Sequence, residues 1–202
     1  TPRREGEEVL DAKLTTGDRQ IMMAAKSVKS IRFEEGKTRP MGRNASGVRG
    51  IKLRDDKDEV VGMVSIADDE SDILVVSEKG YGKRSKLEDY RITNRGGKGV
   101  KTINITPKTG ELVAIKNVTD QDDLMIINKS GITIRMEVSD LRVMGRATQG
   151  VKLINIKDND SIAAVAKVRH EADDVDEADE ADDVMDVPEN ETKTDENHEK
   201  NE

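Results

Sequence analysis

The residues best suited to chemistry are basic side chains and glycines that cluster in the middle of the chain. Between Lys83 and Lys101, seven of 19 residues are basic, and Gly96, Gly97 and Gly99 lie among them. Glycine lets a backbone adopt positive φ and approach another surface closely. Exposed backbone N–H groups flanked by cations suit phosphate oxygens. The cluster therefore indicates phosphate binding, although a hairpin loop with glycines for the turn and lysines for solubility has the same composition.

Catalytic chemistry has little support in the sequence. The glycine-rich loop is not a nucleotide-binding P-loop, because the pattern G-x-x-x-x-G-K-[ST] is absent. The acidic run 55–59 lies between two predicted strands and is interpreted as a solvated turn, and Tyr90 as a packing or phosphate-contacting residue. Cysteine is absent, and His170 and His198 both lie in the polar C-terminal region. We therefore expect no catalytic residue, cofactor or metal site in this chain.

A repeating pattern positions the basic cluster. Arg43, Arg95 and Arg146 each begin the pattern R-x-x-x-G-V, at intervals of 52 and 51 residues. An alternating apolar run follows each pattern and predicts a half-buried strand. A polar turn and a second apolar run come next. The alternating runs are 48–53, 100–105 and 151–156, and the second runs are 60–66, 112–118 and 162–168.

The upstream half of each repeat predicts a β-hairpin. Its first strand corresponds to an apolar run, and a turn and a basic residue follow. Gly80 and Gly131 hold the turn in the second and third repeats, as type I′ or II′ turns favour. Val28 replaces glycine in the first repeat, so we expect that turn to differ. The apolar runs are 21–25, 73–76 and 124–127, and the basic residues are Arg32, Arg84 and Arg135.

Each repeat thus offers about four short strands in roughly 50 residues, the size of one propeller-type blade. We predict an all-β, blade-repeat fold, β-pinwheel or propeller-like, with an aliphatic core and at most a turn of helix near 86–90 and 138–141. The predicted organisation is a remnant of an upstream element at 1–10, repeats at 11–66, 67–118 and 119–168, and a disordered acidic tail at 169–202.

Charge is divided unevenly between the repeats and the tail. The chain has a net charge of −8, but residues 169–202 alone hold 16 acidic and three basic residues, a net charge of −13. The repeats and the segment before them therefore have a net charge of +5. A basic body favours an anionic partner such as nucleic acid. No apolar run approaches the roughly 18 residues of a membrane span, and the lack of cysteine favours a cytoplasmic location.

The segment Arg95–Val100 resembles the gyrase A box, which reads Q-R-R-G-G-K/R-G in the DNA gyrase A family. Thr93 and Asn94 stand where the box has Gln and its first Arg. The loops that begin at Gly42 and Gly145 are similar to other blades of that family, and the resemblance covers about 10–168. The tail follows three repeats, so these look like the last three blades of the family's C-terminal domain.

This resemblance implies a non-catalytic module that binds and wraps double-stranded DNA for a type II topoisomerase. It further implies that the parent protein assembles with a second copy of itself and two B subunits in an A2B2 enzyme. The parent enzyme uses ATP and magnesium elsewhere to introduce negative supercoils, and it is cytoplasmic and nucleoid-associated.

The two nearest alternatives are the C-terminal domain of the topoisomerase IV protein that corresponds to gyrase A and a propeller-like scaffold for protein interaction. Whether the chain is the gyrase A domain or its topoisomerase IV counterpart, we expect the same residues to contact DNA. They belong to the basic positions of the repeats and to the box-like loop. They are Arg43, Lys83, Arg84, Lys86, Arg91, Arg95, Gly96, Gly97, Lys98, Gly99, Lys101, Arg135 and Arg146.

Overall fold

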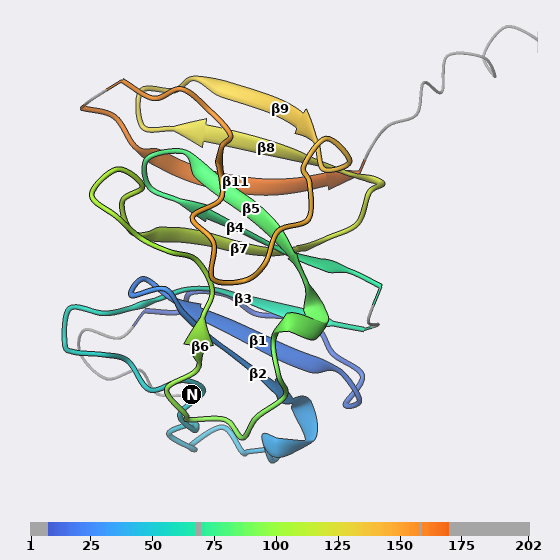
Figure 1. The fold of residues 1–202 in the computed structure, drawn as a ribbon. Coiled ribbons are helices and arrows are strands. Elements are labelled where there is room, and N and C mark those ends of the chain that lie inside the picture. The colour runs from blue at the N-terminus through green and yellow to red at the C-terminus, as the bar shows by residue number, and fades with distance from the viewer. Residues whose placement is uncertain (1–7, 68–69, 158, 170–202) are drawn as a thin grey trace, which may run out of the picture. The chain divides into compact units, whose positions relative to one another are not determined.

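The computed structural model describes residues 8–67, 70–157 and 159–169. Within them the chain forms three antiparallel sheets that follow one another (Figure 1), so the predicted all-β, blade-repeat fold is confirmed. The first sheet has the order β3-β1-β2-β6, the second β10-β5-β4-β7 and the third β11-β8-β9. The strands are β1 (Gln20–Ala25), β2 (Lys29–Glu34), β3 (Val60–Ile66), β4 (Asp72–Ser77), β5 (Tyr81–Lys86), β6 (Val100–Lys101), β7 (Leu112–Val118), β8 (Asp122–Asn128), β9 (Thr133–Glu137), β10 (Val151–Lys152) and β11 (Ile162–Arg169).

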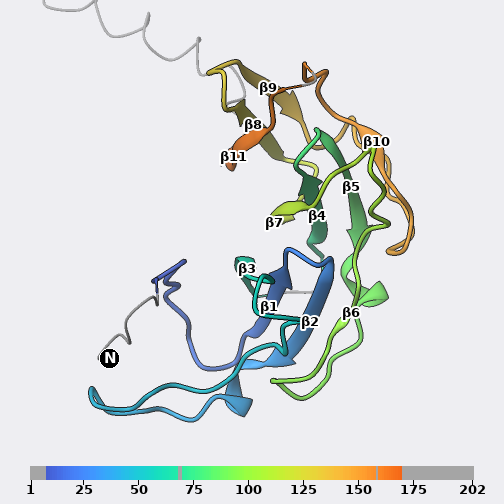
Figure 2. The same ribbon diagram turned by 90° about the vertical axis from the view of Figure 1, so that its left-hand side faces the viewer.

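The sheets and the sequence repeats do not coincide. Strand β6 belongs to the second repeat but pairs with β2 of the first sheet, with Val100 opposite Ser30. Likewise β10 of the third repeat completes the second sheet. Figure 2 shows β6 and β10 on one side of the stack and β3, β7 and β11 on the other. Each of the first two sheets is therefore finished by a strand from the next repeat.

This exchange shortens the strands expected after each R-x-x-x-G-V pattern. The runs 100–105 and 151–156 are strands for only two residues each, and 48–53 has no strand. The expected alternation of burial is not kept, since Val48 and Leu53 are exposed and Thr102 is buried beside Ile103. The pattern also did not predict the ladder partner, which lies in the preceding sheet. Gly150 permits that approach, because a Cβ on it would lie 2.5 Å from the carbonyl oxygen of Gly82.

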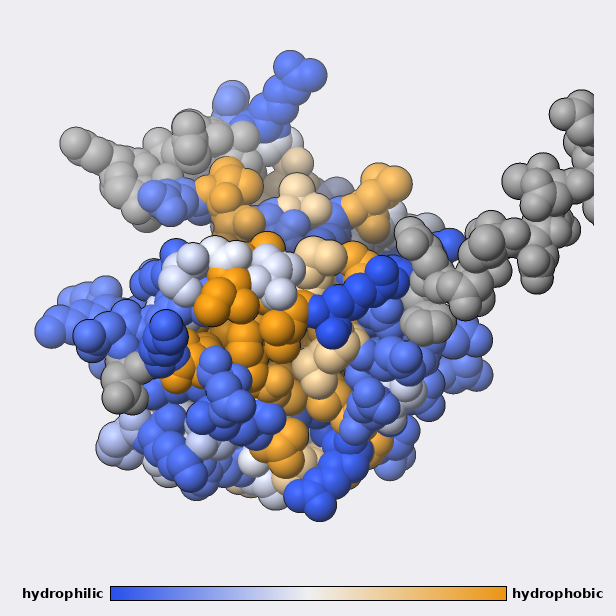
Figure 3. Space-filling view, turned by 90° about the horizontal axis from the view of Figure 1, so that it is seen from above, coloured by the Kyte–Doolittle hydropathy of each residue, from blue (hydrophilic) through white to orange (hydrophobic). Residues whose placement is uncertain are grey.

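The aliphatic core lies between successive sheets. Because strand residues alternate in direction, Val75 of β4 packs in the cluster shared with the first sheet, and Val76 packs in the cluster shared with the third. The outer faces of the stack are less covered. Figure 3, seen from the side of the third sheet, shows an apolar area surrounded by hydrophilic side chains. Met125 and Ile127, which alternate with the buried Leu124 and Ile126, are only half-buried.

Two short 3-10 helices, η1 (Glu35–Lys37) and η2 (Leu87–Asp89), follow the second strand of the first two hairpins. The turn of helix predicted near 86–90 is confirmed by η2. The segment near 138–141 is a turn closed by a hydrogen bond from Leu141 N–H to the Val138 carbonyl (3.0 Å). The corresponding helix η1 was not predicted, because Glu35-Gly36-Lys37 has no apolar residue to indicate it.

The prediction of a different turn at Val28 is wrong. Val28 adopts a φ of +67°, close to +78° at Gly80 and +88° at Gly131. Its N–H donates to Ala25 (2.9 Å), just as the N–H of Gly80 donates to Ser77 (3.0 Å). The first hairpin therefore has the same turn as the other two, with Val28 in a strained backbone conformation.

The outer parts of the predicted organisation are only partly described. Arg169, which we assigned to the acidic tail, is the last residue of β11. The rest of the expected tail, 170–202, lies outside the described residues, as does 1–7 of the expected upstream remnant. Among the residues that the structure describes, no helix has the length and apolar character needed to span a membrane.

Candidate nucleic-acid interface

Three loops, residues 43–52, 95–104 and 146–155, are joined in series by a repeated set of hydrogen bonds, and we call them the rim loops. The N–H of Lys52 donates to the Gly97 carbonyl (2.8 Å), and the N–H of Asn104 donates to the Thr148 carbonyl (3.0 Å). These donors are 52 residues apart and the acceptors 51. The sequence period is therefore reproduced as a structural period, and each rim loop fixes the next.

The arginine that begins each pattern contributes to this linkage. Arg95 donates through Nη1 to the Arg49 carbonyl (3.3 Å) and through Nε to the Lys37 carbonyl (3.0 Å). Arg146 likewise donates to the carbonyl of Lys101. Both are half-buried, so part of each guanidinium fastens one loop to the preceding one. Arg43 occupies the same position in the first rim loop and is exposed.

The glycines of the box-like loop bring it against the first sheet. Gly99 has a φ of +69°, and a Cβ on it would collide with the carbonyl oxygen of Ser30. Gly96 has a φ of +78°, and its N–H donates to the Gly50 carbonyl (2.5 Å). Gly97 is exposed and has no positive φ. Two of the three glycines are thus required by the loop's own geometry.

The expected DNA-contacting cations differ in exposure. Arg91 and Lys98 are exposed on the second rim loop and the segment leading into it, and Lys86 is exposed at the end of β5. Lys101 is half-buried, and its ammonium donates to Asn104 Oδ1 (2.6 Å).

Lys83 does not occupy an exposed position. Its side chain is buried in β5, and Nζ donates to the carbonyls of Gly145 (2.6 Å) and Arg146. Burial lowers the pKa of Lys83 from 10.5 to about 8, with Asp89 opposing this shift and Arg146 adding to it. The ammonium holds the third rim loop against the second sheet, so the expectation that Lys83 contacts DNA is corrected to a structural role.

Arg84 and Arg135 belong to a second repeated contact. Arg32 donates to Gln20 Oε1 (2.5 Å), Arg135 donates to Asp123 Oδ2 (2.7 Å), and Arg84 Nε lies 3.7 Å from Asp72 Oδ2. In each hairpin the arginine and its partner are separated by 12 residues. Each arginine therefore pairs with a polar residue of the adjacent strand, and spacing alone did not show that the side chain points to this partner.

The three arginines also differ in how deeply their side chains are buried. Arg32 also donates to the carbonyls of Leu87 (2.9 Å) and Tyr90 (3.2 Å) in the next repeat. The Arg84 side chain is 10% exposed, whereas the Arg135 side chain is 45% exposed. Arg84 is thus a buried contact between repeats, and only Arg135 keeps part of its guanidinium open to an external anion.

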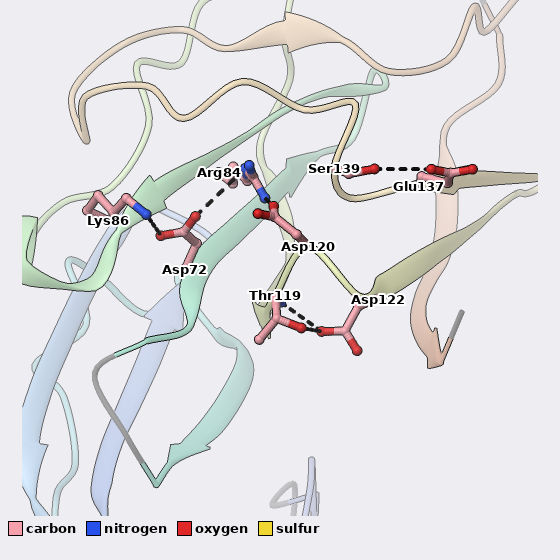
Figure 4. Close-up of polar contacts among 8 residues, drawn as sticks. All are labelled: Asp72, Arg84, Lys86, Thr119, Asp120, Asp122, Glu137 and Ser139. Atoms are coloured by element: carbon pink, nitrogen blue, oxygen red, sulfur yellow. Dashed lines mark hydrogen bonds and ion pairs between the residues drawn. The ribbon is translucent and has the colours of Figure 1, made fainter. Parts of the chain in front are cut away.

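Figure 4 shows the ionic network around Arg84. Asp72, which is buried, faces Arg84 and also lies 3.1 Å from the ammonium of Lys86, and Arg84 reaches Asp120 on the segment between β7 and β8. The Arg84 guanidinium lowers the pKa of the Asp120 carboxyl. Two cations and two carboxylates balance here, so the network is suited to holding strands together.

Neither the buried tyrosine nor the acidic turn is placed for chemistry at the surface. Tyr90 is buried, and its hydroxyl lies 2.7 Å from Thr102 Oγ1. Burial raises the pKa of this phenol. The acidic turn at 55–59 holds Asp58, whose carboxylate accepts hydrogen bonds from the N–H (2.9 Å) and hydroxyl (2.6 Å) of Ser27. In the described part of the chain, no group of three His, Cys, Asp or Glu residues could hold a metal ion.

Sequence reasoning missed Arg49 and Lys152, which are exposed cations at equivalent positions of the first and third repeats. Both directly follow the Gly-Val of the pattern, as does Lys101, so the pattern extends to R-x-x-x-G-V-[K/R] in all three repeats. We call Arg49, Lys101 and Lys152 the rim cations. Lys29 is also exposed and lies opposite Lys101 in the β2–β6 ladder. The signal was present in the sequence as a charged position at the repeat interval.

Antiparallel sheets that are completed by the following repeat, with cations recurring on the exchanged strands, define a blade-repeat domain of the propeller class. Residues 29–67, 71–119 and 122–169 match the family model described as DNA gyrase C-terminal domain, beta-propeller. The chain belongs to this family.

Individual relatives agree with the family match. The chain is 47% identical to the DNA gyrase A protein of Staphylococcus aureus strain MRSA252 and 46% identical to that of strain NCTC 8325, over 84% of this chain and 19% of each relative. It thus spans under a fifth of these proteins' length.

Among solved structures, a DNA gyrase A C-terminal domain matches with a TM-score of 0.69 and 25% identity, covering 76% of this chain and 52% of that one. The C-terminal domain of DNA topoisomerase IV matches with a TM-score of 0.75 and 22% identity, over 80% and 50% of the two chains. The second match shows a shared fold.

Proposed function

We propose that this chain is a DNA-binding and DNA-wrapping module of a gyrase A protein, with no catalytic role of its own. The observation that carries this proposal is the recurrence of the rim cations on loops that are hydrogen-bonded in series. A cation repeated at a fixed structural interval suits the repeated charge of a phosphate backbone. The sequence similarity to DNA gyrase A proteins supports the same function.

The mechanism is backbone binding combined with DNA bending. Phosphate contacts position DNA without reading its sequence. The two helices among the described residues, η1 and η2, have three residues each and are too short to lie in a groove. Bending a duplex requires elastic energy, which distributed phosphate contacts can offset. Successive sheets would present their rim cations to successive phosphates, so the DNA would follow the side of the stack that carries β6 and β10.

For the whole protein, we propose the A2B2 gyrase, in which two copies of the A protein assemble with two B subunits in the cytoplasm on nucleoid DNA. ATP and magnesium would be used in other domains to introduce negative supercoils. The corresponding topoisomerase IV protein remains the alternative at the level of fold, since its C-terminal domain has the same architecture. The curated relatives at 46–47% identity favour gyrase.

Salt-dependent DNA binding tests the proposal. If the three rim cations each neutralise one phosphate, log K should fall with log salt with a slope near −2.7, or roughly 40-fold between 50 and 200 mM salt. The 202-residue chain would be titrated with fluorescent duplexes of unrelated sequence. Equal affinities among these duplexes are expected. Absence of binding at about 50 mM salt, or affinity that does not change with salt, would instead favour a protein-interaction scaffold.

A further inference from the structure

A small cavity opens between β2 and the segment 91–100, where that segment leaves the sheet and returns to it. Its volume is about 190 Å³, or roughly six water molecules at about 30 Å³ each. The segment is held on both sides of the cavity, by Thr93 N–H to the Arg32 carbonyl (2.8 Å) and by the pairing of Ser30 with Val100. The cavity is therefore a fixed feature of the junction between the first two sheets.

The lining of this cavity is cationic and contains no carboxylate. Arg91 and Lys98, both exposed, contribute positive charge, and Thr93 and Asn94 contribute neutral polar groups. Ser30 also lines it, and the Ser30 hydroxyl is buried without a hydrogen-bond partner among the described residues. A buried hydroxyl without a partner is unfavourable, and a ligand with acceptor oxygens would supply one.

The junction between the second and third sheets shows what removes such a space. Lys83 occupies the position of Ile31 there, and its ammonium reaches across to the third rim loop, where Thr148 occupies the position of Gly97. Gln149 stands in place of Lys98. The second junction is thus filled by side chains, and its lysine is the buried Lys83, which is bonded to the loop. The first junction keeps the space and has its lysine, Lys98, exposed on the loop.

We propose that this cavity binds a single phosphate group of the nucleic-acid backbone, with Lys98 and Arg91 as its charged donors. The inference rests on the proposed function and adds to it one defined subsite beside the rim cations. Gly97 keeps the subsite open: a Cβ there would lie 3.5 Å from Ile31 Cδ1 and 3.6 Å from the Asn94 carbonyl oxygen, which are ordinary contacts. A larger side chain at this position can therefore fill the cavity without backbone strain.

Two variants of the full chain test the subsite in duplex-DNA titrations over a range of salt. Lys98→Gln copies the second junction's residue and removes the charge. Gly97→Thr copies Thr148 and fills the space without changing charge. Each should weaken binding severalfold and make the salt slope shallower by about 1, as expected for one lost phosphate contact. The double variant should lose no more than about one contact, because both changes act on the same phosphate.

Gly36→Thr is the matched control, because nothing lies within 4 Å of a Cβ at Gly36 and its φ is not positive; it should leave affinity and slope unchanged. Conversely, the combined change Lys83→Ile, Thr148→Gly and Gln149→Lys should steepen the slope by about 1. If Lys98→Gln weakens binding while Gly97→Thr does not, Lys98 is only a surface contact and the subsite is refuted. Wild-type binding that neither variant alters refutes the subsite alone, and absence of wild-type binding refutes the proposed function.

Discussion

Val28 and Gly80 hold the same left-handed backbone position in successive hairpins, with φ of +67° and +78°. For a β-branched residue this region is strained, by roughly 1–2 kcal/mol. Val28 offsets part of that strain because its side chain packs against the core cluster between the first two sheets. The repeat thus tolerates a residue that local turn chemistry disfavours.

The three equivalent turn positions predict a graded response to valine. Gly131→Val should destabilise the chain by about 1–2 kcal/mol, because only backbone strain opposes it and nothing lies within 4 Å of a Cβ there. Gly80→Val should cost more, because its Cβ would lie 2.7 Å from the Ile154 carbonyl oxygen. Val28→Gly should change stability by under about 1 kcal/mol, since relief of strain offsets lost packing. Urea unfolding of the three variants checks the order, and equal losses at Gly80 and Gly131 would contradict it.

Because burial lowers the pKa of Lys83, the stability of the chain should rise with pH. Its pKa is about 8 in the folded chain and about 10.4 when unfolded. Between these values the unfolded state binds more protons, so stability rises as pH increases through this window. Lys83→Met lacks this titration. The free energy of unfolding of the wild type should therefore increase relative to that of the variant by about 1.5 kcal/mol between about pH 8 and 9.5, because the slope is at most about 1.4 kcal/mol per pH unit. Parallel pH profiles for the two proteins would show that the amine is not desolvated.

Replacing the buried Arg84 should destabilise the chain more than replacing the partly exposed Arg135. Arg84→Gln should destabilise the chain by about 3 kcal/mol or more, because it leaves the buried Asp72 without one of its two cations. Arg135→Gln should cost less, about 1–3 kcal/mol, because Arg135 is 45% exposed although its partner Asp123 is buried. Thermal unfolding measures both, and DNA affinity of folded Arg84→Gln should equal that of the wild type. If Arg84→Gln loses DNA affinity without losing stability, Arg84 contacts DNA directly and its structural role is wrong.

The rim cations predict additive effects on DNA binding. Arg49→Gln and Lys152→Gln should each make the salt slope shallower by about 1 and weaken binding to all duplex sequences alike. Their effects should add, because the residues lie on different rim loops. Lys129→Gln, an exposed change in the β8–β9 turn, is the charge-matched control. If all three variants behave alike, binding depends on net charge and not on the rim.

The change of Arg95 and Lys98 together to Ala should weaken DNA binding more than Arg43→Ala or Arg146→Ala alone. The physical reasons are the density of cations around the box-like loop and the carbonyl contacts of Arg95, which fix the second rim loop to the first. Circular dichroism and thermal unfolding would establish that the double variant is folded. Unchanged affinity in a folded double variant would mean that the box-like loop serves only as a turn.

Much of the fold was predictable because its repeats are regular. The apolar runs at 21–25, 73–76 and 124–127 lie within β1, β4 and β8, because a short continuous apolar run that recurs at 51–52 residues indicates a strand of each repeat. The partner of Val100 was not predictable, because periodicity places a residue on a face but does not choose the neighbouring strand. Exchange with the preceding sheet depends on contacts such as that between Gly99 and Ser30, which are distant in sequence.

The candidate site was predictable as a region and less so residue by residue. Charge density selected Arg91 and Lys98, which are exposed, but it also selected Lys83 and Arg84, which are buried. A basic residue in a strand can face solvent or a buried carboxylate, and composition does not distinguish these. The position after each Gly-Val is exposed at Arg49 and Lys152 and half-buried at Lys101. Repetition alone does not identify a surface position, because the position of Arg32 and Arg84 is also basic in every repeat and both of these side chains are buried.

The exchanged strands also govern the order in which the chain can be assembled as it is synthesised. The first sheet lacks its edge strand until Val100 and Lys101 have left the ribosome, and the second until Val151 and Lys152 have followed. At about 5–20 residues per second, each sheet waits several seconds after its own three strands are made. During that interval its open edge exposes unpaired backbone groups to other chains, and arrival of the next repeat closes it.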